Sequence, residues 1–253
     1  MNPEALLSVA RQAAEAGAAE LVKKYRGTLN INTKSSDADY VTDADLASET
    51  AVRKVLKDLR PNDTVTGEEY DATGTDSSEV YWSIDPLDGT VNFARGLPNW
   101  AVSVGAKDLS TGEWVAGVVL SPKLGVTYYA HKGGGAFVER EGVIKQLRGP
   151  VERTTQIVAT GFSYDAADRV RQFARLAELM PDFVDVRRLG AAALDMCMVA
   201  EGSVDVYYEA GIKEWDWAGA MVIAEEAGLD VIRPQFTGDL GVVARDASRF
   251  RKN

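Results

Sequence analysis

Apolar residues in the first sixty positions recur with the 3.6-residue spacing of helices. One alanine-rich helix is expected from Pro3 to about Tyr25, with proline at its favoured first position. A second helix is expected to follow a cap at Thr42 or Asp43. Four residues are expected to form its buried face: Leu46, Thr50, Val55 and Leu59.

Beyond Pro61 the pattern changes to short runs rich in β-branched and aromatic residues, with turn signals between them. These runs predict a largely antiparallel sheet from six segments: Thr64–Thr66, Val80–Ile84, Ala101–Ala106, Trp114–Leu120, Val126–Ala130 and Ala136–Val138. In the second half of the chain, strands and helices alternate. Strands are expected at Ile157–Thr160, Phe183–Arg187, Val204–Tyr208 and Leu240–Ala244, and helices at Ala167–Met180, Gly190–Ala200 and Trp215–Ala227.

The two patterns together predict a layered sandwich of mixed α+β and α/β type. We place an N-terminal α+β subdomain at residues 1–150 and a smaller C-terminal α/β subdomain at residues 151–253. No linker-like composition marks the boundary, so the two parts are expected to share an interface rather than to form independent domains.

Composition narrows the class of protein. The chain has 253 residues, of which 45% are hydrophobic, and this is enough to bury a substantial core. The single cysteine, Cys197, excludes an intramolecular disulfide framework, and no apolar run approaches the roughly 18 residues of a membrane span. The N-terminus lacks the pattern of a secretory signal, so a cytoplasmic location is expected.

Charge narrows the chemistry further. The net charge is −10, which disfavours general binding to a nucleic-acid backbone. One histidine and one cysteine exclude a zinc site of the usual ligands. A metal site in this chain would be built from oxygen ligands, which favour Mg²⁺, Mn²⁺ or Ca²⁺. Such cations would allow an acidic protein to bind a small phosphorylated substrate.

The most informative stretch is DPLDGT at residues 85–90, which ends an apolar strand. A turn can aim Asp85 and Asp88 at one point, because they are three residues apart and Pro86 restricts the backbone between them. A helical turn is expected to open after Gly89, and its free N–H groups suit a phosphate oxygen. The stretch therefore combines ligands for cations with a site for an anion.

Other acidic residues could join this pair, at Glu68-Glu69, at Asp216 near a helix start, and in the segment 39–45. Each of them also has an ordinary interpretation as a turn, a helix cap or a solvated loop. Their spacing alone does not show that they converge.

Four segments resemble the inositol monophosphatase family of metal-dependent sugar phosphatases, which shares a superfamily with fructose-1,6-bisphosphatase. They are Asp39–Asp45 (DYVTDAD), Gly67–Glu69 (GEE), Trp82–Phe93 (WSIDPLDGTVNF) and Trp215–Gly219 (WDWAG). Their order and separation match the family, and the similarity runs from about Pro3 to about Ala244. The resemblance implies an αβαβα sandwich.

The resemblance also implies a role for each matching position. The implied metal ligands are Glu68, Asp85, the Leu87 carbonyl, Asp88 and Asp216, with Glu69 as an additional ligand of a weaker third ion. Two or three Mg²⁺, or Mn²⁺, would be bound. The implied catalytic residues are Thr90, Asp45 and Glu68, with Thr90 and Asp45 together orienting the attacking water.

Substrate contacts follow from the same resemblance. The implied set is Asp88, Gly89, Thr90, Gly190, Ala192, Glu209 and Asp216, with Lys34 as a further cation near the site. Lys213 lies at a position where relatives vary and could bind a second anionic group. Glu209 matches the acid that bonds inositol hydroxyls, whereas Ala191 stands where relatives often have threonine. The Arg187-Arg188 pair is interpreted as solvated or as a subunit contact rather than as a phosphate clamp.

These features favour a Mg²⁺-dependent phosphomonoesterase that hydrolyses inositol-1-phosphate by direct attack of water. Histidinol phosphate and fructose-1,6-bisphosphate stay open as alternative substrates. An alternative of another class is a non-catalytic regulatory protein associated with RNA or polymerase. The resemblance further implies a homodimer and inhibition by lithium. No membrane partner and no direct binding to nucleic acid are expected.

Overall fold

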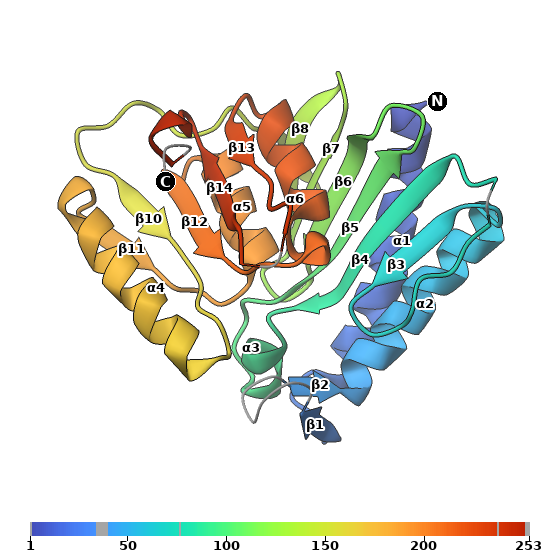
Figure 1. Cartoon of the computed structure of the whole chain (residues 1–253). Coiled ribbons are helices and arrows are strands. Elements are labelled where there is room, and N and C mark those ends of the chain that lie inside the picture. Colours follow the sequence, from blue (N-terminus) through green and yellow to red (C-terminus); the bar gives the residue numbers. More distant parts are fainter. Residues whose placement is uncertain (1, 34–39, 76, 237, 251–253) are drawn as a thin grey trace.

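The computed structural model describes residues 2–33, 40–75, 77–236 and 238–250 (Figure 1). Its helices are α1 (Pro3–Lys24), α2 (Asp43–Leu59), α3 (Thr90–Ala94), α4 (Ala166–Leu179), α5 (Ala192–Glu201) and α6 (Glu214–Glu226), with short 3₁₀ turns at Met180–Asp182 and Ser248–Phe250. No described helix combines the length and the apolar character that crossing a bilayer requires.

The larger sheet holds seven strands in sequence order. They are β3 (Thr64–Gly67), β4 (Val80–Asp88), β5 (Ala101–Asp108), β6 (Glu113–Ser121), β7 (Val126–His131), β8 (Gly135–Arg140) and β9 (Val143–Gln146). Only the β3–β4 pair is parallel among these described strands, so the predicted, largely antiparallel arrangement is confirmed. The sequence did not predict β9. β1 (Ile31–Thr33) and β2 (Tyr40–Thr42), also not predicted, form a separate antiparallel pair.

The second sheet holds five strands from the last hundred residues. Its order is β11 (Asp185–Arg187), β10 (Ile157–Ala159), β12 (Val206–Ala210), β14 (Leu240–Ala244) and β13 (Asp230–Ile232). β10 is parallel to both β11 and β12, whereas β14 is antiparallel to its neighbours. The short β13 was not predicted, and β12 is shifted two residues beyond the predicted strand.

The layers alternate between helices and sheets, as the predicted αβαβα fold requires (Figure 1). α1 and α2 cover one face of the larger sheet, and α5 and α6 lie between the two sheets. On the outer face of the second sheet, Leu176 of α4 packs with residues of β10, β12 and β14. The close packing of α6 depends on glycines: a Cβ on Gly117 would stand 2.1 Å from the carbonyl oxygen of Gly219.

The buried face of α2 differs from the predicted one. Leu46, Thr50 and Leu59 are exposed and Val55 is only partly buried. The residues that point inward are Ala44, Asp45, Ser48, Glu49, Val52 and Leu56. The prediction was wrong because the inward face also holds three polar side chains, Asp45, Ser48 and Glu49, which are buried with hydrogen-bond partners from other segments.

Candidate active site

The carboxyl end of β4 carries two acidic residues on an interrupted strand. Its pairing with β5 shifts register between Asp85 and Asp88, which bends the strand as a β-bulge does. The N–H of Leu87 donates to Oδ1 of Asp85 at 3.0 Å, and Gly89 then adopts a φ of +90°. α3 begins immediately afterwards, so the predicted helical turn is present.

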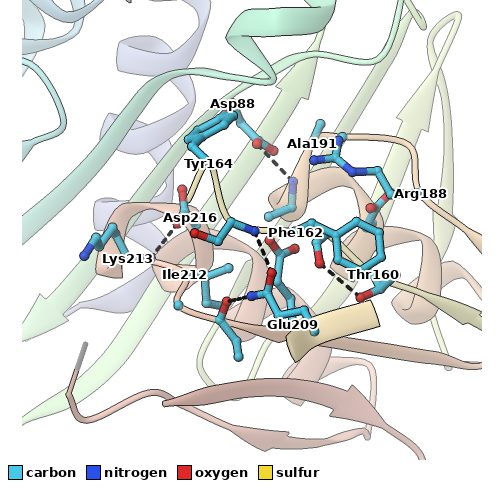
Figure 2. A pocket seen from close by; sticks show the side chains of 18 of the residues that line it. Asp88, Thr160, Phe162, Tyr164, Arg188, Ala191, Glu209, Ile212, Lys213 and Asp216 are labelled. Atoms are coloured by element: carbon cyan, nitrogen blue, oxygen red, sulfur yellow. Dashed lines mark hydrogen bonds between the residues drawn. The ribbon is translucent and has the colours of Figure 1, made fainter. Parts of the chain in front are cut away.

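A cavity of about 720 Å³ opens at this point (Figure 2). Most of the residues assigned to the site from the sequence line it: Glu68, Asp85, Leu87, Asp88, Gly89, Thr90, Gly190, Ala192, Glu209, Lys213 and Asp216. They come from both sheets and from the helices between them. Acidic residues that are far apart in the sequence therefore meet in one pocket.

Asp88 connects β4 to the N-terminus of α5. Its Oδ1 accepts a hydrogen bond from the N–H of Ala192 at 3.0 Å, and its Oδ2 accepts one from Ala193 at 2.8 Å. Burial raises the pKa of Asp88 to about 7, although these N–H groups act in the opposite direction. Each carboxylate oxygen keeps a further lone pair for a cation.

Asp85 and Asp216 face the same cavity. Burial raises the pKa of Asp85 well above its usual value, and the negative charges of Glu68, Asp88 and Asp216 raise it further. Burial likewise raises the pKa of Asp216, whose Oδ2 accepts a hydrogen bond from the N–H of Lys213 at 2.5 Å, at the start of α6. The carboxylates are thus close enough to repel one another.

This donor set fits a hard divalent cation. Within the described ranges, no three acidic, histidine or cysteine side chains are already gathered tightly enough to hold one metal ion. The acids nevertheless raise one another's pKa, and a cation between them would replace that repulsion with attraction. All the available donors are oxygens, which is the set that Mg²⁺ prefers.

Thr90 connects the cavity to a buried acid behind it. Its hydroxyl lies 3.1 Å from Oδ1 of Asp45 and 3.1 Å from the carbonyl oxygen of Leu87. Asp45 does not line the cavity; it is wholly buried in α2, where its Oδ2 accepts hydrogen bonds from the N–H and hydroxyl of Thr42. Thr90 therefore connects Asp45 to the cavity.

The two glutamates of the GEE segment differ in position. Glu68 lines the cavity, whereas Glu69 does not. The N–H of Glu69 donates to Oε2 of Glu49, a wholly buried residue of α2, at 2.8 Å. The other oxygen of Glu49 is paired with Nε of Arg53 at 2.7 Å. A Cβ on Gly67 would stand 2.3 Å from this carboxylate, so glycine lets it approach the loop.

Glu209 lies on the side of the cavity away from β4, as Figure 2 shows. Its Oε2 accepts a hydrogen bond from the hydroxyl of Tyr207 at 2.8 Å. Lys213 is exposed on the cavity rim. Lys34, which the resemblance brought into the site, lies outside the described residues.

Six charged residues that line the cavity were not assigned to it from the sequence: Asp165, Asp168, Arg171, Arg175, Arg188 and Asp195. Arg188 is exposed and lines the pocket, while its neighbour Arg187 pairs with Asp185 at 2.6 Å. Asp195 lines the pocket although it is only 1% exposed. The signal for Asp195 was present, because it is a lone acid in the apolar run Leu194–Val199.

Comparisons with known proteins agree with this geometry. A model of the Inositol monophosphatase family matches residues 2–247. Inositol-1-monophosphatase SuhB of Mycobacterium tuberculosis (strain ATCC 25618 / H37Rv) is 43% identical over 208 residues, which cover 80% of this chain and 71% of that protein. Nus factor SuhB of Pasteurella multocida (strain Pm70) is 38% identical over 231 residues, covering 90% and 84%.

Solved structures share the fold as well. The crystal structure of extragenic suppressor protein suhB from Bartonella henselae superposes with a TM-score of 0.86 at 29% sequence identity, covering 98% of this chain and 96% of that one. The fold and the resemblance inferred from the four sequence segments are both confirmed. This chain belongs to the inositol monophosphatase family, whose members are metal-dependent phosphatases.

Proposed function

We propose that this protein is a Mg²⁺-dependent phosphatase that hydrolyses inositol-1-phosphate to inositol and phosphate. The observation that carries the proposal is the convergence of Glu68, Asp85, Asp88 and Asp216 on one cavity. A purely structural role does not explain four acids in one largely buried place, because burying like charges together destabilises the fold.

The resemblance assigns the ligands, and the presence of these groups in one cavity supports the assignment. Glu68, Asp85 and the Leu87 carbonyl would hold one Mg²⁺, and Asp85, Asp88 and Asp216 would hold a second. Glu68 or Glu69 would help to hold a weaker third, and Mn²⁺ would be accepted because it prefers the same oxygen donors. When bound, the ions supply Lewis-acid activation of water and charge neutralisation at the phosphate.

The chain's own residues orient the reaction. The N–H groups at Gly89 and Thr90, at the start of α3, would bind phosphate oxygens. The Thr90 hydroxyl, which donates to Asp45, would accept a hydrogen bond from the attacking water and hold that water in line with the ester bond. Water adds to phosphorus and gives up one proton, the ester P–O bond breaks, and the departing alkoxide takes up a proton, so that the proton count balances. No covalent intermediate on the enzyme is needed.

Two observations support inositol-1-phosphate as the substrate. A relative with 43% identity carries the name inositol-1-monophosphatase, and Glu209 stands in the cavity where hydroxyl groups of the departing alcohol would lie. Glu209 and the Gly190–Ala192 segment would contact that alcohol, and Lys213 would contact a group at the rim. Histidinol phosphate and fructose-1,6-bisphosphate are the substrates to compare with it.

The experiment is a phosphate-release assay on the purified protein with Mg²⁺, across inositol, sugar and amino-alcohol phosphates. We expect the highest kcat/KM on inositol-1-phosphate and no turnover after chelation by EDTA. A much higher kcat/KM on histidinol phosphate than on inositol-1-phosphate would overturn the substrate assignment. We also expect Li⁺ to inhibit, because it can occupy the weaker metal position after turnover.

A regulatory role is the second function to test, because a relative with 38% identity is named Nus factor SuhB. The net charge of −10 argues against direct RNA binding. We propose a cytoplasmic enzyme without nucleic-acid binding. Salt-sensitive nanomolar binding of RNA, together with no phosphatase activity on the substrate panel, would reverse this ranking.

We propose that the protein is a homodimer. On α4, Val170 is 71% and Phe173 is 56% exposed, and Val184 beside the edge strand β11 is also exposed. Large apolar side chains that are this exposed to solvent on one helix face favour association with a second chain. Sedimentation should give a dimer mass for the wild-type chain and a monomer mass for Phe173→Glu. A monomeric wild-type chain would contradict this.

A further inference from the structure

Asp195 in α5 is a buried acid that the proposed mechanism does not use. Its side chain is 1% exposed and lines the cavity. Its Oδ1 is fully enclosed and has no hydrogen-bond partner among the residues that the structure describes. Asp88, by comparison, receives a backbone N–H on each oxygen. A buried carboxylate oxygen without a donor is costly, so its partner is expected to come from elsewhere.

The neighbours of Asp195 place it beside the region proposed for the departing alcohol. The negative charges of Asp88 and Glu209 act on Asp195, and the positive charge of Arg188 acts on both Asp195 and Glu209. Tyr207 already donates to one oxygen of Glu209, whereas the corresponding donor for Asp195 is missing among the described side chains. Asp195 nevertheless lines the cavity, so a donor bound there would approach its carboxyl group from that side.

We propose that Asp195 determines specificity, by accepting a hydrogen bond from a second hydroxyl group of a polyhydroxy alcohol whose first hydroxyl groups bind Glu209. The inference rests on the proposed function and narrows its substrate class to phosphate esters of polyols with neighbouring hydroxyl groups. A site that satisfies buried acceptors only with substrate hydroxyls rejects analogues that lack them.

The charges around Asp195 bear on which hydrogen-bond donor the substrate can offer to it. A second phosphate placed beside Asp195 would face the negative charges of Asp88 and Glu209 as well, with Arg188 as the counter-charge that acts on Asp195 and Glu209. An ammonium group would be attracted by the same carboxylates, so the comparison with histidinol phosphate in the substrate panel separates it from a hydroxyl donor. Hydroxyl groups supply hydrogen-bond donors without adding charge of either sign.

The test compares two substrates on the same Mg²⁺-loaded enzyme. Inositol-1-phosphate has hydroxyl donors in its leaving group, and 4-nitrophenyl phosphate has none. Asp195→Ala should lower kcat/KM for inositol-1-phosphate about 10- to 100-fold, mainly through KM, because a hydrogen bond between the substrate and a buried carboxyl group is lost. The same variant should change kcat/KM for 4-nitrophenyl phosphate less than about twofold.

Cys197→Ala is the matched control, because Cys197 is wholly buried two residues further along α5 and carries no charge. It should leave the ratio of the two kcat/KM values unchanged. Equal losses on both substrates in Asp195→Ala would show a purely structural role and overturn the proposal, and so would no loss on either.

A second measurement keeps the proposal testable if Asp195→Ala does not fold. Asp195→Asn keeps the size of the side chain, and the wild-type enzyme should discriminate against deoxyinositol phosphates that lack single hydroxyl groups. We expect one hydroxyl whose removal costs the wild type about 10-fold or more but costs Asp195→Asn less. Equal discrimination by both proteins would overturn the proposal. Failure of the proposed function is separate, since the wild type itself would then fail to hydrolyse inositol-1-phosphate efficiently.

Discussion

The carboxylate of Glu49 in α2 accepts a hydrogen bond from the backbone N–H of Glu69, 2.8 Å away and directly beside Glu68. Two other buried residues of the same helix face reach the other segments of the site. Ser48 donates to the carbonyl oxygen of Pro86 at 2.8 Å, and Asp45 accepts from Thr90 at 3.1 Å. Spacing of three and four residues places all three on one side of the helix. A single helix thus supports every N-terminal segment of the cavity.

Replacing Glu49 should therefore weaken metal binding without removing a ligand. In Glu49→Gln, one of the two donors, the N–H of Glu69 or Nε of Arg53, would face an amide NH₂ instead of an oxygen. We expect the Kd for Mg²⁺, measured by calorimetry without substrate, to rise about 10- to 100-fold, as is typical when a group that orients a metal ligand is lost.

Val52→Ala provides the control for this change. Val52 is wholly buried on the same face of α2 but packs against Gly17 of α1, away from the cavity. It should lower Tm while leaving the Mg²⁺ Kd near the wild-type value. A wild-type Kd in folded Glu49→Gln would show that this hydrogen bond does not position Glu68.

Asp88→Asn should abolish Mg²⁺-dependent turnover. The substitution removes a proposed metal ligand, and it also points an amide NH₂ at the N–H of Ala192 or Ala193. We expect kcat/KM to fall by more than about 100-fold. That value is the upper range for residues that only orient a metal ligand. Phosphate release on inositol-1-phosphate measures this, and near-normal turnover would contradict the metal-ligand assignment.

Replacing Thr90 should change kcat more than KM, because its hydroxyl is proposed to orient the attacking water rather than to bind the alcohol. Thr90→Val keeps the shape of the side chain but loses the hydroxyl, and we expect kcat to fall about 100-fold or more. Thr90→Ser keeps the hydroxyl and should retain most of the activity. Equal kcat values for the two variants would refute this role.

The metal-free protein should lose stability as pH rises toward neutrality. Burial raises the pKa of Asp88 to about 7, whereas an unfolded aspartate has a pKa of about 3.9. The folded state therefore binds this proton more tightly than the unfolded state does. The stabilising contribution is complete below the unfolded pKa and is lost between about pH 4 and pH 7.

Tm measured against pH in EDTA tests this prediction. The decline between about pH 4 and pH 7 should be shallower in Asp88→Asn, which cannot ionise at this position. Mg²⁺ should raise Tm increasingly over the same interval, because it binds the ionised carboxylates and displaces their protons. Identical pH profiles for the wild type and Asp88→Asn would contradict the assigned pKa.

Local signals in the sequence were sufficient for the main elements of the fold. Pro3 at the start of the first helix, the apolar runs of the larger sheet, and the proline and glycine within Asp85–Gly89 act over a few residues, so they can be interpreted without the rest of the chain. The motif segments likewise predicted which acids would line one cavity, although the convergence itself came from resemblance rather than from spacing.

Only the tertiary structure decided the roles of side chains whose partners are distant in sequence. In the sequence, Glu49 resembles an ordinary helix residue and Asp195 a lone acid in an apolar helix. The tertiary structure places the N–H of Glu69 beside Glu49 and puts Asp195 in the wall of the cavity. The inward face of α2 was missed for the same reason. Whether a polar group can be buried depends on the donors and acceptors that other segments bring to it, and those are fixed by packing rather than by local pattern.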